Sequence, residues 1–119
     1  MPELDPAAIE RLRRLGGDAL TGKMASLFLG LAPERLRAAR EGLTAGDHDA
    51  IRRAAHSLKS SAGNIGAGAI LEDSGRLEDA AESGAPMEDL EPLYAALEAD
   101  VEAARPELVD LAAKEESPS

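Results

Sequence analysis

Apolar residues recur along this chain at intervals of three and four positions, which places them on one face of an α-helix. The recurrence predicts a succession of helices. Their apolar faces contain Ile9, Leu12 and Leu15; Leu20, Met24, Leu27, Phe28 and Leu31; Leu36, Ala39 and Leu43; Ile51, Ala54, Ala55, Leu58, Ala62 and Ile65; Ile70, Leu71, Leu77 and Ala81; and Leu90, Leu93, Leu97, Val101, Leu108 and Leu111. No such series follows Ala113, so we expect residues 114–119 to be a disordered tail.

Glycine, proline and aspartate separate these series and predict where the helices begin and end. The predicted boundaries are Asp5-Pro6 and Gly16-Gly17 for the first helix, Asp18 for the start of the second, Pro33 and Ala45-Gly46 for the third, Asp47 and Gly66-Ala67-Gly68 for the fourth, and Ser83-Gly84-Ala85-Pro86 between the fifth and the sixth. We expect Pro106 to kink or interrupt the last helix, because proline cannot donate the backbone hydrogen bond of a helix interior.

The composition agrees with an all-helical protein, because 24 Ala and 17 Leu stand against only 4 Ile, 2 Val and 2 Thr. The connections are short, so consecutive long helices should run antiparallel. We therefore predict an all-α fold, an up-down antiparallel four-helix bundle with additional short N-terminal helices. Residues 1–113 should form a single domain.

Charge and composition exclude several functions. The net charge of −10 argues against nucleic acid, and one Tyr, one Phe and no Trp leave no stacking surface for bases. The absence of Cys excludes disulfides, thiolate zinc sites and thiol nucleophiles. No apolar run is long enough to span a membrane, and Met1-Pro2-Glu3 is unlike a signal peptide. We expect a complete, cytoplasmic and monomeric chain.

The fourth predicted helix places His56 on its solvent side. Each residue advances about 100°, so the apolar stripe from Ile51 to Ile65 faces the core and His56 lies about 150° from its centre. The face of His56 also carries Arg52, Lys59, Ser60 and Gly63. Glycine in a helix interior costs up to about 1 kcal/mol, so its presence here indicates a surface kept clear for another protein.

An exposed imidazole flanked by cations is suited to carrying a phosphoryl group. Neutral imidazole is a nucleophile toward phosphorus, nearby cations disfavour its protonation, and Lys59 can offset charge on the transferring oxygens. The sequence has no Walker-type or kinase-type glycine loop, and no acidic magnesium site beside His56. Residues 1–67 carry a net charge of +2 and residues 68–119 a net charge of −12, so the cations for this chemistry lie in the first half.

The segment from Ala55 to Ala67 resembles the signature of histidine-containing phosphotransfer domains, the relay modules of bacterial two-component signalling. That signature reads His, any residue, Leu, Lys, Gly and Ser, followed by small residues and a Gly-Ala. Sparser landmarks of the family resemble Phe28, Pro33 with Leu36, Gly46-Asp47 and Leu77-Glu78, so the resemblance covers about residues 4–105.

The resemblance implies a phosphorelay carrier without kinase activity of its own. His56 would accept the phosphoryl group at Nε2 from a receiver-domain aspartate and pass it to another, and Lys59 would steady the phosphoryl oxygens. Partner binding would involve Arg52, Ser60 and Gly63. Ser60 replaces the usual glycine, and because serine is also small we expect transfer to survive, with room for an altered partner preference. The implied partners are response-regulator receiver domains and a sensor or hybrid histidine kinase. No cofactor is expected, since magnesium would belong to the receiver. Further apolar receiver contacts could come from Ile9, Leu12, Leu20 and Met24, although most of these could equally be core residues.

Two alternatives stay open on the sequence. A helical docking module could bind a receiver or kinase without transferring phosphate, with Ser60 as a sign of drift. The phosphate-accepting module of a chemotaxis-type histidine kinase has a similar motif, but its ATP-binding part would lie elsewhere. His48 is assigned no role, and neither histidine has the partner spacing of a helical metal site.

Overall fold

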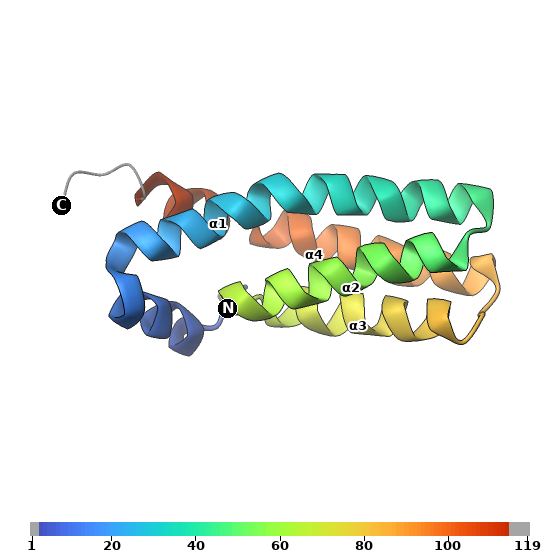
Figure 1. Cartoon of the computed structure of the whole chain (residues 1–119), viewed down its shortest axis with the longest axis horizontal. Coiled ribbons are helices and arrows are strands. Elements are labelled where there is room, and N and C mark those ends of the chain that lie inside the picture. Colours follow the sequence, from blue (N-terminus) through green and yellow to red (C-terminus); the bar gives the residue numbers. More distant parts are fainter. Residues whose placement is uncertain (1–2, 115–119) are drawn as a thin grey trace.

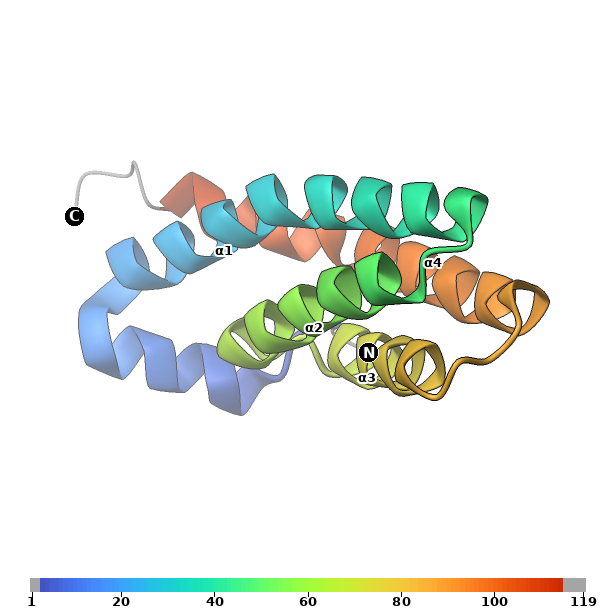
Figure 2. The same cartoon turned by 45° about the vertical axis from the view of Figure 1, so that its right-hand side comes forward.

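The computed structural model describes residues 3–114, and these residues form four helices joined by short turns (Figure 1). The helices are α1 (Pro6–Ala45), α2 (His48–Ile65), α3 (Gly68–Glu82) and α4 (Met87–Ala113). α1 and α3 each pack against α2 and α4, and successive helices alternate in direction (Figures 1 and 2). The predicted all-α, up-down four-helix bundle is confirmed. Apart from Lys114, the predicted tail lies outside the described residues.

The first helix bends sharply at Gly16-Gly17, where the sequence predicts a helix end. Gly17 has φ of 70° and ψ of −163°, a conformation that glycine adopts far more readily than other residues. The short segment before the bend turns back toward the C-terminal end of α2 (Figures 1 and 2). There the N–H of Asp5 donates to the carbonyl of Gly66 at 2.8 Å. This segment corresponds to the first of the additional N-terminal helices expected from the sequence.

Two prolines do not break their helices as the sequence led us to expect. Pro33 lies inside α1, so the second and third predicted helices are one, and Pro106 lies inside α4. Both rings are exposed. A proline on the outer side of a helix removes one hydrogen bond but leaves the freed carbonyl accessible to water, so packing of the opposite face can hold the helix together.

The two ends of α2 follow the predicted capping pattern. The carboxylate of Asp47 accepts a hydrogen bond from the N–H of Ala50 at 3.1 Å. At the other end Gly66 takes a left-handed conformation with φ of 73°, and its N–H bonds to the carbonyl of Ala62. These caps fix the length of the helix that carries His56.

The bundle closes over aliphatic side chains that belong to the predicted apolar faces. The buried set includes Phe28, Leu36 and Leu43 of α1, Ile51, Leu58 and Ile65 of α2, Ile70 and Leu77 of α3, and Leu90, Leu97 and Leu108 of α4. Full burial of one such side chain contributes about 1.5–3 kcal/mol. The buried stripe on α2 therefore sets the rotation of this helix about its own axis.

Some members of the predicted apolar faces are not buried. Leu15 is 73% exposed and Leu27 is 58% exposed, and Leu71 is also exposed. They lie on helix faces that no other helix of the described chain covers. No helix of residues 3–114 is long and apolar enough to cross a membrane.

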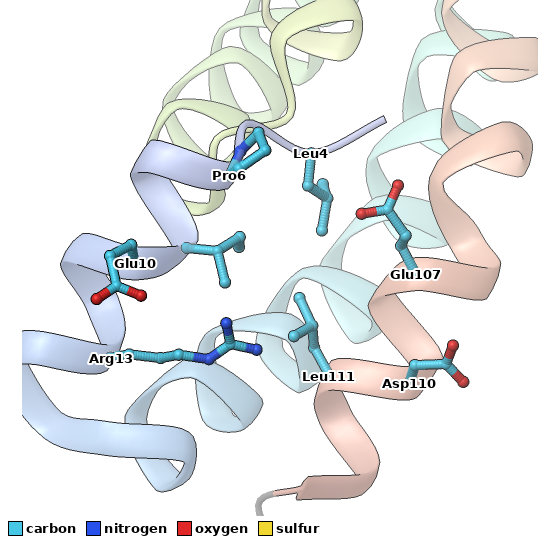
Figure 3. Close-up of a pocket in the computed structure, with 8 residues that line it drawn as sticks. Leu4, Pro6, Glu10, Arg13, Glu107, Asp110 and Leu111 are labelled. Carbon is cyan, nitrogen blue, oxygen red and sulfur yellow. The ribbon is translucent and has the colours of Figure 1, made fainter. Parts of the chain in front are cut away.

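A cavity of about 520 Å³ lies between the first segment of α1 and the C-terminal part of α4 (Figure 3). Leu4 and Leu111 form part of its wall, and Arg13 extends toward it from α1 (Figure 3). Ile9 also lines this cavity and is buried. Ile9 is therefore a core residue rather than the receiver contact suggested by the sequence, whereas Leu12, Leu20 and Met24 are half-buried.

Two carboxyl groups meet between α3 and α4. A hydrogen bond with Asp73, together with burial, raises the pKa of Asp100 from 3.8 to about 6. The charges of Glu3 and Glu72 act in the same direction. Asp73 itself accepts a hydrogen bond from Arg76 at 3.1 Å.

We expect Asp100→Asn to stabilise the protein at neutral pH. The folded-state pKa of Asp100 lies above its ordinary value, so the protonated carboxyl stabilises the fold fully below pH 3.8, and this stabilisation is lost as the pH rises through about 6. An amide can donate to Asp73 at any pH. At pH 7.5 the variant should gain about 1–2 kcal/mol in urea unfolding, allowing for partial solvent screening.

The matched control is Asp110→Asn, an exposed aspartate on the same helix. It should change the free energy of unfolding by less than about 0.5 kcal/mol at every pH. If the stability of Asp100→Asn fell between pH 5 and 7 as steeply as that of the wild type, the carboxyl pair would not be the cause.

Candidate functional site

His56 lies near the middle of α2 on the side that faces solvent. Its side chain is 57% exposed, as the helical periodicity predicts. The opposite side of the same helix carries Leu58 and Ile51, which are fully buried. The core packing of α2 thus holds the imidazole outward on a rigid element.

Glu78 of α3 reaches the imidazole from the neighbouring helix. Its Oε2 lies 2.7 Å from Nδ1 of His56. A carboxylate only accepts hydrogen bonds, so Nδ1 must carry the proton in this contact. In the neutral ring the lone pair then resides on Nε2, which is the nitrogen not engaged by Glu78. The contact therefore prepares Nε2 as a nucleophile.

Lys59 shares the same carboxylate. Its ammonium nitrogen lies 2.5 Å from Oε1 of Glu78, whose side chain is only 11% exposed. Burial alone would raise the pKa of Glu78, but the contacts with Lys59 and His56 outweigh it and hold that pKa below its ordinary value. The contact with Glu78 in turn raises the pKa of Lys59. The carboxylate and the ammonium are both charged at neutral pH.

Two glycines leave the helix surface beside this cluster without side chains. A Cβ at Gly75 of α3 would lie 3.5 Å from Cδ of Lys59, so the lysine stem rests against bare backbone. A Cβ at Gly63 of α2 would meet only Leu71, at 3.8 Å. Packing within the described chain therefore leaves room for a side chain at Gly63, and the exposed Leu71 lies next to it.

The other predicted partner-binding residues, Arg52 and Ser60, lie one helical turn before and after His56 on α2. Arg52 turns toward Asp49, with Nη2 2.9 Å from Oδ1, and this carboxylate also binds Arg53 at 3.0 Å. Ser60 is exposed one helical turn after His56. The structure thus brings together His56, Lys59 and Glu78, and leaves Arg52 and Ser60 on the surrounding surface.

Sequence reasoning noted Glu78 as a family landmark and did not assign it to the site. Its contact with His56 depends on the register between α2 and α3, which the helical periodicity of either segment does not reveal. One signal was available in the sequence, because Glu78 directly follows Leu77 of the predicted apolar face. An acidic residue at the edge of an apolar face usually has a partner.

His48 takes part in the bundle rather than in this site. Its Nε2 lies 2.7 Å from the carbonyl oxygen of Ala85, in the turn before α4. Within residues 3–114, His, Asp and Glu side chains form no cluster of three or more that could hold a metal ion.

Comparison with known proteins assigns the class. The profile of the Hpt domain matches residues 23–107, so the chain belongs to the Hpt domain family. The chain is similar to the crystal structure of histidine-containing phosphotransfer protein B (HptB) from Pseudomonas aeruginosa PAO1. The two are 26% identical over 98% of each chain, with a TM-score of 0.86. No curated protein matches the chain.

Membership of this family defines the general role. Hpt proteins are phosphocarriers rather than kinases, so the chain is a histidine phosphotransfer protein of a two-component phosphorelay. Its partners are of the two-component type, such as receiver domains and kinases.

We expect Glu78→Gln to let the neutral imidazole of His56 adopt either tautomer. Glutamine can donate as well as accept, so Nδ1 no longer has to carry the proton. In the wild type, ¹⁵N NMR of the imidazole should report the Nδ1–H form, and the variant should shift toward Nε2–H. The variant should also be about 1–2 kcal/mol less stable, because Lys59 loses its ion partner.

Glu82→Gln is the matched control, since Glu82 is an exposed acid one turn further along α3. Its imidazole spectrum should equal that of the wild type. An unchanged His56 tautomer in Glu78→Gln would show that Glu78 does not set it.

Proposed function

We propose that His56 accepts a phosphoryl group at Nε2 from the aspartyl phosphate of one receiver domain and passes it to the aspartate of another. The observation that carries this proposal is the 2.7 Å contact between Nδ1 of His56 and Glu78 on an otherwise exposed imidazole. It leaves the nucleophilic nitrogen free, and the receiver can reach it without any movement of the bundle.

The transfer needs few groups from this chain. The Nε2 lone pair attacks phosphorus, the N–P bond forms, and the P–O bond to the receiver aspartate breaks so that its carboxylate leaves. The ring becomes positively charged, and the Nδ1 proton stays hydrogen-bonded to the Glu78 carboxylate, which stabilises that charge. Attack by a second receiver carboxylate on phosphorus reverses these steps and restores the neutral ring.

Lys59 supplies the positive charge at this site. Its ammonium is held beside the imidazole by Glu78, where it can attract the phosphoryl oxygens. Magnesium would belong to the receiver, and no cofactor is proposed for this chain. We further propose that the protein is monomeric and cytoplasmic, that a sensor or hybrid histidine kinase stands upstream, and that the chain has no ATP-dependent activity.

The proposal predicts that label from a phosphorylated receiver appears on His56 alone. The label should be stable in alkali and labile in acid, and His56→Gln should abolish it. His48→Gln is the matched control, because it changes the other histidine of the chain. Equal labelling of wild type and His56→Gln would refute the assignment, and receiver binding without any label would favour a docking module that does not transfer phosphate.

A substitution at Gly63 tests whether the receiver docks on the surface that this glycine leaves without a side chain. We expect Gly63→Gln to keep or raise the free energy of unfolding, by up to about 1 kcal/mol, because glutamine favours helix and the site has room for it. The same variant should slow transfer from a receiver, because the added side chain blocks close approach. Urea unfolding and transfer kinetics measure the two effects, and unimpaired transfer would remove Gly63 from the docking surface.

A further inference from the structure

A second feature lies on the other flank of the helix that carries His56. A groove of about 350 Å³ runs between α1 and α2, lined by Arg35, Ala38, Ala50, Arg53, Ala54 and Ser57. One water occupies about 30 Å³ of liquid, so the groove has room for a side chain with its hydration. Alanines form much of its wall, and an arginine stands on each helix.

Arg35 is held in place without a counter-charge. It is half-buried on α1, and its Nε donates to Oγ of Ser57 at 2.9 Å. Arg37 and Arg40 of the same helix pair with Glu41 and Glu91, whereas Arg35 has no carboxylate within ion-pair distance among the described residues. A guanidinium carries five N–H donors, and Ser57 uses one of them.

The second helix adds to the positive charge of the groove. Nε of Arg53 lies 3.0 Å from Oδ2 of Asp49, and the same carboxylate also binds Arg52. Arg52 and Arg53 therefore share one aspartate, and Arg35 adds a third positive charge that no carboxylate of the described residues pairs with. The excess charge favours an anionic occupant, and a planar guanidinium matches a carboxylate in geometry.

The groove lies close to the proposed docking partner. Ser57 follows His56 directly, and its side chain points about 100° further round the helix. Arg53 lies between these two directions, at about 60° from His56. A receiver that covers Nε2 of His56 therefore reaches the edge of the groove, on the side away from Glu78.

We propose that this groove receives an acidic side chain of the docked receiver domain, and that Arg35 pairs with it and selects among receivers. This inference rests on the proposed function, because it takes the receiver as the partner. The hydrogen bond from Ser57 reduces the freedom that Arg35 would lose on binding, so the ion pair forms at a low entropic cost. Receivers without an aspartate or glutamate at the matching position would bind more weakly.

The test compares Arg35→Gln with the matched control Arg37→Gln, which removes an exposed arginine on the same helix. The probes are the isolated receiver domains of the source organism and phosphoramidate, a small phosphoryl donor that needs no docking surface. For receivers that exchange phosphate with the wild type, Arg35→Gln should raise KM about tenfold, leave kcat unchanged and weaken the salt dependence of KM. Labelling by phosphoramidate should be unchanged, and Arg35→Lys should recover part of the loss.

The outcomes separate this inference from the proposed function. An unchanged KM with every receiver, or a loss of phosphoramidate labelling in Arg35→Gln, would overturn the docking role of Arg35. If the wild type exchanges phosphate with no receiver, the proposed function fails. Calorimetric titration with the unphosphorylated receivers then tests the groove alone, and the inference fails if none binds or if Arg35→Gln leaves the Kd of every receiver that binds unchanged. Charge reversal gives a direct check, since Arg35→Glu should be rescued by one acid-to-arginine change on the receiver.

Discussion

The carboxylate of Glu78 stands between His56 and Lys59, the two side chains to which the proposed function assigns the chemistry. One oxygen accepts the Nδ1 proton of His56, and the other lies against the ammonium of Lys59. The Lys59 ammonium and the Nδ1–H of His56 together compensate for burying this carboxylate. The site consequently needs α2 and α3 in one fixed register, and it links the orientation of the imidazole to the integrity of the bundle.

The bundle supplies that register through its core and its turns. Ile51 and Leu58 set the rotation of α2, and the left-handed Gly66 ends the helix so that α3 can turn back beside it. Gly75 lets the stem of Lys59 lie close to the backbone of α3. The geometry of the cluster of His56, Lys59 and Glu78 thus follows from ordinary helix packing and requires no strained segment at the site.

Much of this could be predicted from the sequence, because periodicity and capping are local properties. The apolar stripe of α2 places His56 outward, and Asp47 and Gly66 mark the ends of its helix. Contacts between helices are not local, which is why Glu78 was not assigned to the site. Arg52 lies one turn before His56 on α2, as the sequence predicts, and it pairs with Asp49 of the same helix. The predicted helix start at Pro33 was wrong for a related reason. Tertiary packing keeps α1 continuous at a proline where local propensity predicts a break.

The central claim is that Glu78 keeps the proton on Nδ1 and so directs phosphorylation to Nε2. The most direct measurement is ³¹P–¹⁵N coupling in the phosphorylated protein with ¹⁵N-labelled histidine. The account predicts that phosphorus couples directly to Nε2 of His56 while Nδ1 remains protonated. Phosphorus attached to Nδ1, or to any residue other than His56, would contradict it.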